Sequence, residues 1–90
     1  MAEIITADGT VREVQPANGK NFTLKELTPI VGGYIEIIYL NDGRLMIMNE
    51  EGKLSRLPDN EVATALARSS ISPDDYIVGD VLVCNQHEIK

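Results

Sequence analysis

The fold is decided by Thr23–Thr64, which reads TLKELTPIVGGYIEIIYLNDGRLMIMNEEGKLSRLPDNEVAT. Thr23 and Glu26 have the spacing of a capping box, in which a hydroxyl and a carboxylate each satisfy an unpaired backbone N–H at a helix start. The pair Gly32-Gly33 predicts the end of that helix, because glycine accepts the left-handed conformation without steric cost. Pro29 lies deep in the segment and is expected to bend or shorten the last turn. The apolar stripe expected on this helix consists of Leu24, Leu27 and Val31.

A β-hairpin is predicted directly after the glycine pair. Two apolar runs, Tyr34–Leu40 and Leu45–Asn49, flank Asp42-Gly43, a dipeptide that is typical of two-residue type I′ turns. With those two turn residues, Glu36 lies opposite Asn49 and both side chains share one face. Because both faces are largely apolar, we expect the hairpin to lie centrally in a sheet and to be covered on both sides.

The segments outside the hairpin predict further strands and a second helix. An N-terminal hairpin is expected from Ile4–Thr6 and Val11–Val14, which flank another Asp-Gly pair. The remaining elements expected are a short strand over residues 53–57, a helix that Asp59 or Asn60 caps and that ends near Ser69, and a last strand over Tyr76–Asn85 with a bulge at Gly79-Asp80. The second helix is expected to bury Val62, Ala65 and Leu66.

These elements predict one α+β domain over residues 1–90, a mainly antiparallel sheet with two short helices in the order β-β-α-β-β-β-α-β. Within it we place an N-terminal hairpin at residues 3–15, a core at residues 23–85 and a polar tail at residues 86–90.

Composition limits the classes of partner. The chain carries 14 acidic and 8 basic residues, a net charge of -6, without a cluster of Lys and Arg. Duplex nucleic acid is therefore not an expected partner, because phosphate binding needs clustered basic side chains. The sequence shows neither a signal peptide nor an apolar stretch of the ~20 residues that span a bilayer. We expect a cytoplasmic protein without a membrane partner and, because so short a chain buries little surface, a homo-oligomer.

Residues that would carry catalysis or hold a metal are scarce. Cys84 and His87 are the single cysteine and the single histidine, so neither a disulfide framework nor a thiolate or imidazole cluster is expected. We interpret the adjacent acids Glu50-Glu51 and Asp74-Asp75 as solvated turn residues rather than acid and base pairs. The sequence therefore predicts no enzyme, no catalytic residue, no metal and no cofactor.

The best candidate for a binding residue is Glu36, which interrupts an apolar strand. A buried carboxylate needs a partner, or its pKa rises until it is neutral. The expected register places Asn49 opposite Glu36, with Tyr34 and Glu51 on the same face, so the four side chains are expected to form a polar pocket beside Gly32-Gly33. Such a pocket can hydrogen-bond a base or a ribose while Tyr34 stacks on it. The alternative is a satisfied structural network that pins the hairpin to the helix end.

Two further candidates lie at the start of the second helix. Asn60 and Thr64 are four residues apart and share one helix face, where free N–H groups can meet an anion. Capping explains Asn60 without any ligand. The Gly32-Gly33 pair follows a helix, whereas phosphate loops precede one, so helix termination is its better explanation.

Six motifs extend over about two-thirds of the chain: Leu24-Lys25-Glu26-Leu27, Val31-Gly32-Gly33-Tyr34-Ile35-Glu36, Asn49-Glu50-Glu51-Gly52-Lys53-Leu54, Leu57-Pro58-Asp59-Asn60, Ala63-Thr64 and Val78-Gly79-Asp80. In these motifs the chain resembles a family of small proteins of unknown function that phages, plasmids and other bacterial mobile elements encode. The N-terminal hairpin lies outside this resemblance, and Thr28-Pro29 departs from the family pattern.

The resemblance implies a setting rather than an activity. Small phage proteins often neutralise host defence, and one strategy is to bind and sequester a nucleotide signal without catalysis. Our first hypothesis is such a protein, with Tyr34, Glu36, Asn49, Asn60 and Thr64 at the ligand and Arg44 or Arg56 of a neighbouring subunit at its phosphates. The alternatives are an inhibitor that docks an acidic surface on a host factor, and an accessory interaction protein without a small-molecule ligand.

Overall fold

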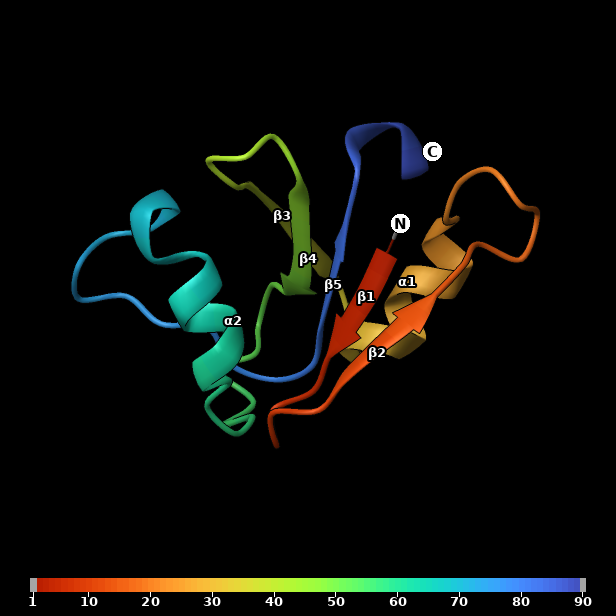
Figure 1. Ribbon diagram of the computed structural model, residues 1–90. Helices are drawn as coiled ribbons and strands as arrows, with labels where there is room; N and C mark the ends of the chain where they lie inside the picture. Colours follow the sequence, from red (N-terminus) through yellow and green to blue (C-terminus); the bar gives the residue numbers. More distant parts are fainter. Residues whose placement is uncertain (1, 90) are drawn as a thin grey trace.

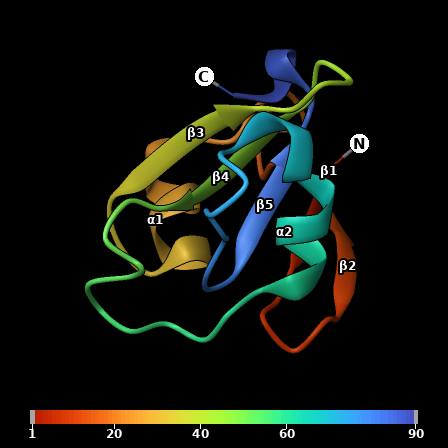
Figure 2. The same cartoon turned by 90° about the vertical axis from the view of Figure 1, so that its left-hand side faces the viewer.

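The chain folds into a five-stranded antiparallel sheet with one α-helix on each face (Figures 1 and 2). This computed structural model describes residues 2–89. In chain order the elements are β1 (Ala2–Ile5), β2 (Val11–Val14), α1 (Leu24–Val31), β3 (Ile35–Tyr39), β4 (Leu45–Asn49), α2 (Glu61–Leu66), the 3₁₀ turn η1 (Arg68–Ser70), β5 (Val81–Cys84) and the 3₁₀ turn η2 (Gln86–Glu88). The strands lie in the order β2-β1-β5-β4-β3. The α+β prediction is confirmed.

Helix α1 begins and ends where the sequence predicts. The Thr23–Glu26 capping box is present, and the Glu26 carboxylate accepts from the Thr23 N–H at 3.1 Å and from the Ala17 N–H at 3.0 Å. These bonds, that from Ala17 foremost, lower the pKa of Glu26. The helix continues through Pro29 and stops at Gly32, which has a φ of 84°. Of the expected apolar stripe, Leu27 and Val31 are buried, whereas Leu24 is 64% exposed.

The β3–β4 turn differs from the predicted type I′ turn. The Gly43 N–H donates to the Leu40 carbonyl at 3.0 Å, and the Leu40 N–H donates to the Arg44 carbonyl at 2.8 Å. Gly43 alone has a positive φ, 89°, so the connection is a type I turn followed by a left-handed glycine. The reason lies in Asp42, whose carboxylate accepts from the Arg44 N–H at 3.0 Å and thereby closes a side-chain turn across the glycine.

The first hairpin has the same turn. The Gly9 N–H donates to the Thr6 carbonyl at 2.9 Å, Gly9 has a φ of 93°, and the Thr10 N–H donates to the Asp8 carboxylate at 3.0 Å. An aspartate before the glycine thus selects a three-residue loop in both hairpins.

This turn shifts the register of β3 against β4 by one residue. Ile35, not Glu36, lies opposite Asn49, and Glu36 lies opposite Met48. Because a shift of one residue moves a side chain to the other face, Glu36 and Asn49 lie on opposite faces of the sheet. The predicted register, and with it the shared face of these two residues, is wrong.

Each face of the sheet carries its own core. On the α1 face the buried residues are Ala2, Ile4, Phe22, Leu27, Val31, Leu45, Ile47, Leu82 and Cys84. On the α2 face they are Ile5, Leu40, Met46, Ala63, Ala67, Ile77, Val81 and Val83. All four residues of β5, the central strand, are buried. The predicted central position holds for β4 but is wrong for β3, which forms an edge of the sheet and exposes 68% of Tyr39.

Helix α2 is held by Asn60, whose side chain is fully buried at 0% exposure. Its amide group donates to the Ile5 carbonyl at 3.0 Å and to the Gly79 carbonyl at 2.8 Å, and its oxygen caps the helix by accepting from the Ala63 N–H at 3.0 Å. These bonds fix the rotation of the helix, so Ala63 and Ala67 face the sheet. The predicted inner residues, Val62, Ala65 and Leu66, are exposed.

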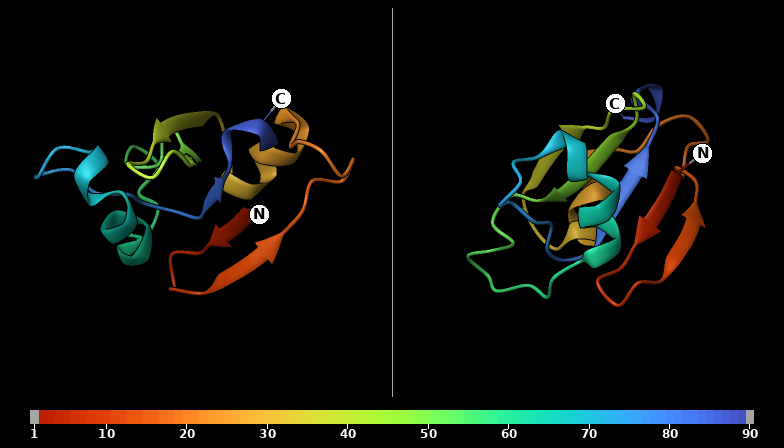
Figure 3. Two further views of the ribbon diagram at one scale, coloured as in Figure 1. Left: turned by 45° about the horizontal axis from the view of Figure 1, so that its top comes forward. Right: turned by 60° about the vertical axis from the view of Figure 1, so that its left-hand side comes forward.

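Two of the predicted strands also differ from the structure. Residues 53–56 form turns rather than a strand, and Figure 3 shows the connection between β4 and α2 as a loop that extends away from the sheet before it reaches α2. At Gly52 the loop packs closely against Val78, since a Cβ added to this glycine would lie 2.7 Å from a Val78 methyl group. The last strand begins at Val81 rather than Tyr76, because Gly79, with a φ of 76°, turns the chain before it.

We predict that Asn60→Ala lowers the free energy of unfolding by about 3 kcal/mol, because it leaves two buried carbonyl groups and a helix start unsatisfied. Urea unfolding measures the change, and Asn60→Ser, which keeps the cap acceptor, should lose less. The control is Asn41→Ala in the exposed β3–β4 turn, for which a loss under about 1 kcal/mol is expected. Equal losses in the two alanine variants would contradict this role of Asn60.

Candidate functional site

A cleft of about 500 Å³ lies on the α1 side of the sheet, beside the Gly32-Gly33 pair. We call it the hairpin cleft. Its lining residues are Leu24, Thr28, Gly32, Gly33, Tyr34, Ile35, Asn49, Glu50, Glu51 and Ser55. The volume falls in the range of small-molecule sites, about 300–1,000 Å³. The cleft contains three of the four side chains predicted for a polar pocket, Tyr34, Asn49 and Glu51, and lacks the fourth, Glu36.

The chemistry of the hairpin cleft is aromatic and acidic. The Tyr34 side chain is 76% exposed and the Leu24 side chain is 64% exposed, so both offer apolar surface to a ligand. The charged residues in the lining are Glu50 and Glu51, both exposed. A planar group can stack on the tyrosine ring, and the carboxylates can accept from hydroxyl or amino groups. A phosphate would be repelled within the cleft itself.

Asn49 lines the cleft but has its polar atoms engaged by the backbone. Its amide group donates to the Val31 carbonyl at 3.1 Å, and its oxygen accepts from the Glu51 N–H at 2.8 Å. An added Cβ on Gly33 would lie 3.1 Å from the Asn49 amide nitrogen, so the glycine lets the side chain approach the helix end. These contacts match the structural alternative, in which Asn49 pins the hairpin to α1.

A second, smaller hollow of about 190 Å³ lies on the α2 side of the hairpin. We call it the Lys53 hollow. It is lined by Glu36, Ile38, Met48, Asn49, Glu50, Lys53, Leu54, Ile71, Asp75, Tyr76, Ile77 and Val78. Glu36 is therefore at the rim of a hollow, although its side chain is exposed rather than buried in the strand.

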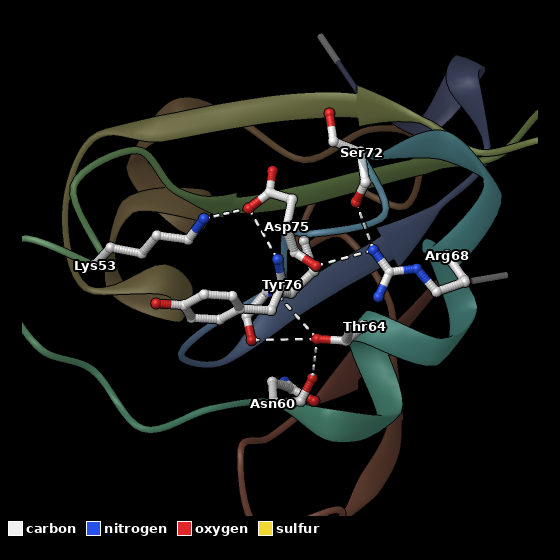
Figure 4. Close-up of polar contacts among 8 residues, drawn as sticks. Lys53, Asn60, Thr64, Arg68, Ser72, Asp75 and Tyr76 are labelled. Atoms are coloured by element: carbon white, nitrogen blue, oxygen red, sulfur yellow. Dashed lines mark hydrogen bonds and ion pairs between the residues drawn. The ribbon is translucent and has the colours of Figure 1, made fainter.

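Lys53 lines this hollow. Its side chain points toward Asp75 and Tyr76 (Figure 4). Its ammonium group forms an ion pair with the Asp75 carboxylate and lies 4.4 Å from the centre of the Tyr76 ring, within reach of a cation–π contact. Asp75 also accepts from the Tyr76 N–H at 2.8 Å, and the bond from Lys53 is the main cause that lowers the pKa of Asp75. Asp75 is thus partly exposed, at 42% of its side chain, and also paired with Lys53, a contact that the sequence did not predict.

Asn60 and Thr64 lie together, as their spacing predicts, next to Tyr76 (Figure 4), but neither lines the hairpin cleft or the Lys53 hollow. The Thr64 hydroxyl donates to the Asn60 carbonyl at 2.8 Å and accepts from the Ile77 N–H at 2.9 Å. Asn60 is fully buried and therefore offers no surface to an anion, and the Thr64 hydroxyl is engaged by the backbone, so both residues fasten α2 to the segment before β5.

Arg44 and Arg56, the two arginines predicted to contact a phosphate, lie in separate turns. Arg44 follows Gly43 at the far end of the hairpin, where its Nε bonds the Asp42 carboxylate at 2.7 Å. Arg56 lies in the turns after β4 and has a left-handed φ of 56°, which is rare for a residue other than glycine. Within one chain, neither arginine lines the hairpin cleft or the Lys53 hollow.

Sequence reasoning missed the contribution of Leu24 and Ser55 to the hairpin cleft and of Lys53 and Asp75 to the second hollow. The place of Leu24 could have been inferred from the sequence, because it lies one turn before Thr28 and so beside the core positions Leu27 and Val31 of the helix. The role of Asp75 could not have been inferred, because its partner Lys53 is 22 residues away in the chain.

Reactive groups remain few in the described part of the chain. Residues 2–89 contain no group of three His, Cys, Asp or Glu side chains placed to hold a metal ion. Burial raises the pKa of the Cys84 thiol to about 11, so this group stays protonated at neutral pH. Over the same residues, no helix has the length and apolar character needed to cross a bilayer.

One family of proteins matches almost the whole chain. A sequence model for the family described as "Domain of unknown function (DUF3846)" matches residues 2–89. The chain belongs to this family. The match includes the N-terminal hairpin, which the resemblance had left outside. Searches of curated proteins and of solved structures gave no match.

We predict that Asp75→Asn reduces the acid sensitivity of the fold. The pKa of Asp75 is lowered in the folded state, so its carboxylate stabilises the fold above its unfolded pKa of about 4, and this contribution is lost as the pH falls through the lowered value. Between about pH 6 and pH 3, melting temperature should therefore fall less in Asp75→Asn than in the unmodified protein. Asp74→Asn, which removes the adjacent carboxylate, is the control and should behave like the unmodified protein.

Proposed function

We propose that this protein binds and sequesters a nucleotide-derived small molecule without catalysis, as a counter-defence protein of a phage or another mobile element. The observation that carries the proposal is the hairpin cleft, which places an exposed Tyr34 beside the backbone of Gly32-Gly33. The mobile-element setting comes from the resemblance of the motifs and supports the biological role rather than the chemistry.

The charges of the cleft specify which end of such a ligand it would take. Glu50 and Glu51 suit ribose hydroxyls and base amino groups, which donate hydrogen bonds to carboxylates. Tyr34 suits the face of the base. We therefore place the nucleoside end in the cleft and the phosphates outside it. Glu36, Asn60 and Thr64 lie outside the cleft and are not among the proposed ligand contacts. Asn49 stabilises the cleft through its bonds to the backbone.

We predict that at least one compound in a panel of adenosine, ADP-ribose and cyclic dinucleotides raises the melting temperature. A ligand at about 100 times its dissociation constant stabilises the fold by about 2.7 kcal/mol. For a domain of this size that corresponds to a rise of roughly 10–20 °C. Tyr34→Ser should abolish the rise by removing the stacking surface, and Tyr76→Ser, outside the cleft, should keep it.

Mass spectrometry after heat release completes this test, because a sequestering protein returns its ligand unchanged. Conversion of the ligand would contradict the non-catalytic part of the proposal. If no compound in the panel raises the melting temperature, lysate from defence-activated cells provides the unbiased source of ligand. A protein that releases no small molecule from that lysate does not have the proposed function.

A second candidate function, binding of a basic host protein, is favoured by the surface around the Lys53 hollow. Glu36 and Glu50 border this hollow beside Leu54, which is 83% exposed, and the whole chain has a net charge of -6. An apolar side chain among carboxylates is suited to a protein surface that presents Lys or Arg.

For this candidate we predict co-purification with a host protein that nucleotides do not displace. Double substitution of Glu36 and Glu50 by Gln should weaken the complex at least tenfold, since charge complementarity would be lost. The same complex should also weaken as the salt concentration rises. The matched control changes Glu3 and Glu13, which pair across β1 and β2, to Gln. Equal retention of the host protein by the two double variants would exclude this surface.

A further inference from the structure

Within residues 2–89, strand β3 has an edge that no other segment pairs with. It is a terminal strand of the sheet, and the ladder bonds at its two ends, those of Tyr34 and Leu40 to β4, are both 2.8 Å long. Bonds to one neighbour involve every second residue of an antiparallel strand. The N–H and C=O groups of Ile35, Ile37 and Tyr39 therefore point away from β4, toward the open side of the sheet.

The two edges of the sheet differ in how they are protected. Strand β2, at the opposite edge, has charged residues at two of its four positions, Arg12 and Glu13. Strand β3 reads IEIIY and has neither Lys nor Pro, and its one charge is Glu36. It exposes 37% of Ile37 and 68% of Tyr39. Charges and proline are the usual means of keeping an edge strand unpaired, so β3 is open to pairing.

We propose that β3 pairs antiparallel with β3 of a second copy of this chain, around a two-fold axis at Ile37, and joins two sheets into one. In this register Ile37 lies opposite Ile37 of the second copy, Ile35 opposite Tyr39, and Glu36 opposite Ile38. All three outward residues of each strand then exchange both of their backbone hydrogen bonds.

The side chains favour a second copy over a foreign strand. The register places an aromatic residue opposite a β-branched residue twice, which is a stabilising cross-strand pair. Glu36 meets Ile38 rather than its own symmetry mate, so no two acids lie directly opposite each other. A two-fold interface needs such self-complementarity, and homodimers are the commonest oligomers. The net charge of -6 on each copy opposes association, and physiological salt screens that repulsion beyond about 8 Å.

The pairing would also extend the hairpin cleft, a consequence that rests on the proposed function. Ile35 lines the cleft, and Tyr39 of the second copy would lie opposite it on the same face. Arg44 of the second copy lies opposite that copy's Leu40, which is buried on the α2 face, so the pairing does not bring the Arg44 side chain to the cleft.

The oligomeric state of the ligand-free protein tests the pairing. We expect the mass of a dimer by light scattering or sedimentation at protein concentrations on the order of 0.1 mM, and a dissociation constant at least about tenfold weaker in Ile37→Lys. Val62→Lys is the matched control, because Val62 is 40% exposed and lies on α2, away from β3. A monomer under these conditions, or a dimer equally weakened by both variants, would overturn the proposal.

Disulfide formation tests the register. Glu36 and Ile38 of opposite copies would form a pair without hydrogen bonds between their backbones, in which Cα atoms are about 4.5 Å apart. A mixture of the Glu36→Cys and Ile38→Cys variants should form a mixed disulfide dimer on mild oxidation, and neither variant alone should do so efficiently. Cys84 is buried and would not compete. Efficient linkage within either single variant would refute the axis at Ile37. A correctly linked dimer that binds no nucleotide would support the pairing and contradict the proposed function alone.

Discussion

The hydrogen bond between the Arg44 N–H and the Asp42 carboxylate sets the arrangement of the hairpin on which both candidate sites depend. It selects a three-residue loop, and the loop fixes which residues of β3 and β4 lie opposite each other. From this register follow the two cores, the exposure of Glu36 on the α2 face and the position of Asn49 against α1. The same bond at Asp8 sets the first hairpin. Two short turns thus determine which side chains meet in most of the sheet.

The sequence predicted the local elements well because their signals are local. The capping box, the glycine stop and both Asp-Gly hairpins involve residues within a few positions of one another, and each forms near its predicted place. One error was local, because the bond from the Arg44 N–H to Asp42 changed the turn and the register of β3 against β4. The other errors arose where contacts between distant residues decide the structure. The rotation of α2 depends on Asn60 reaching Ile5, 55 residues away, and the edge position of β3 depends on β5 pairing with β1 and β4. The segment over residues 53–57 satisfies its backbone locally instead, with the Ser55 N–H donating to the Glu51 carbonyl at 2.9 Å and the Leu57 N–H to the Gly52 carbonyl at 3.0 Å.

The candidate site was harder to predict because a small domain uses its polar side chains to satisfy its own backbone. Asn49 and Asn60 have short amide groups that can both donate and accept, and each one joins two or more backbone segments that no regular element connects. Thr64 does the same for Ile77. Large apolar side chains offer the exposed surface instead, among them Tyr34, Leu24 and Tyr39. The sequence pointed to Tyr34 as a ligand contact but placed Leu24 in the apolar stripe of its helix.

Exposure of these side chains is a cost that a small soluble domain ordinarily avoids, and all three lie on or beside one edge of the sheet. An aromatic side chain left in water loses the burial free energy of roughly 1.5–3 kcal/mol that a core position would give it. A ligand in the hairpin cleft can cover Leu24 and Tyr34, which line it, and a second copy along β3 can cover Tyr39. The two possibilities are compatible, because the cleft opens on one face of the sheet and the unpaired hydrogen-bonding groups lie in its plane. A single edge of the sheet can in this way serve both to associate and to bind.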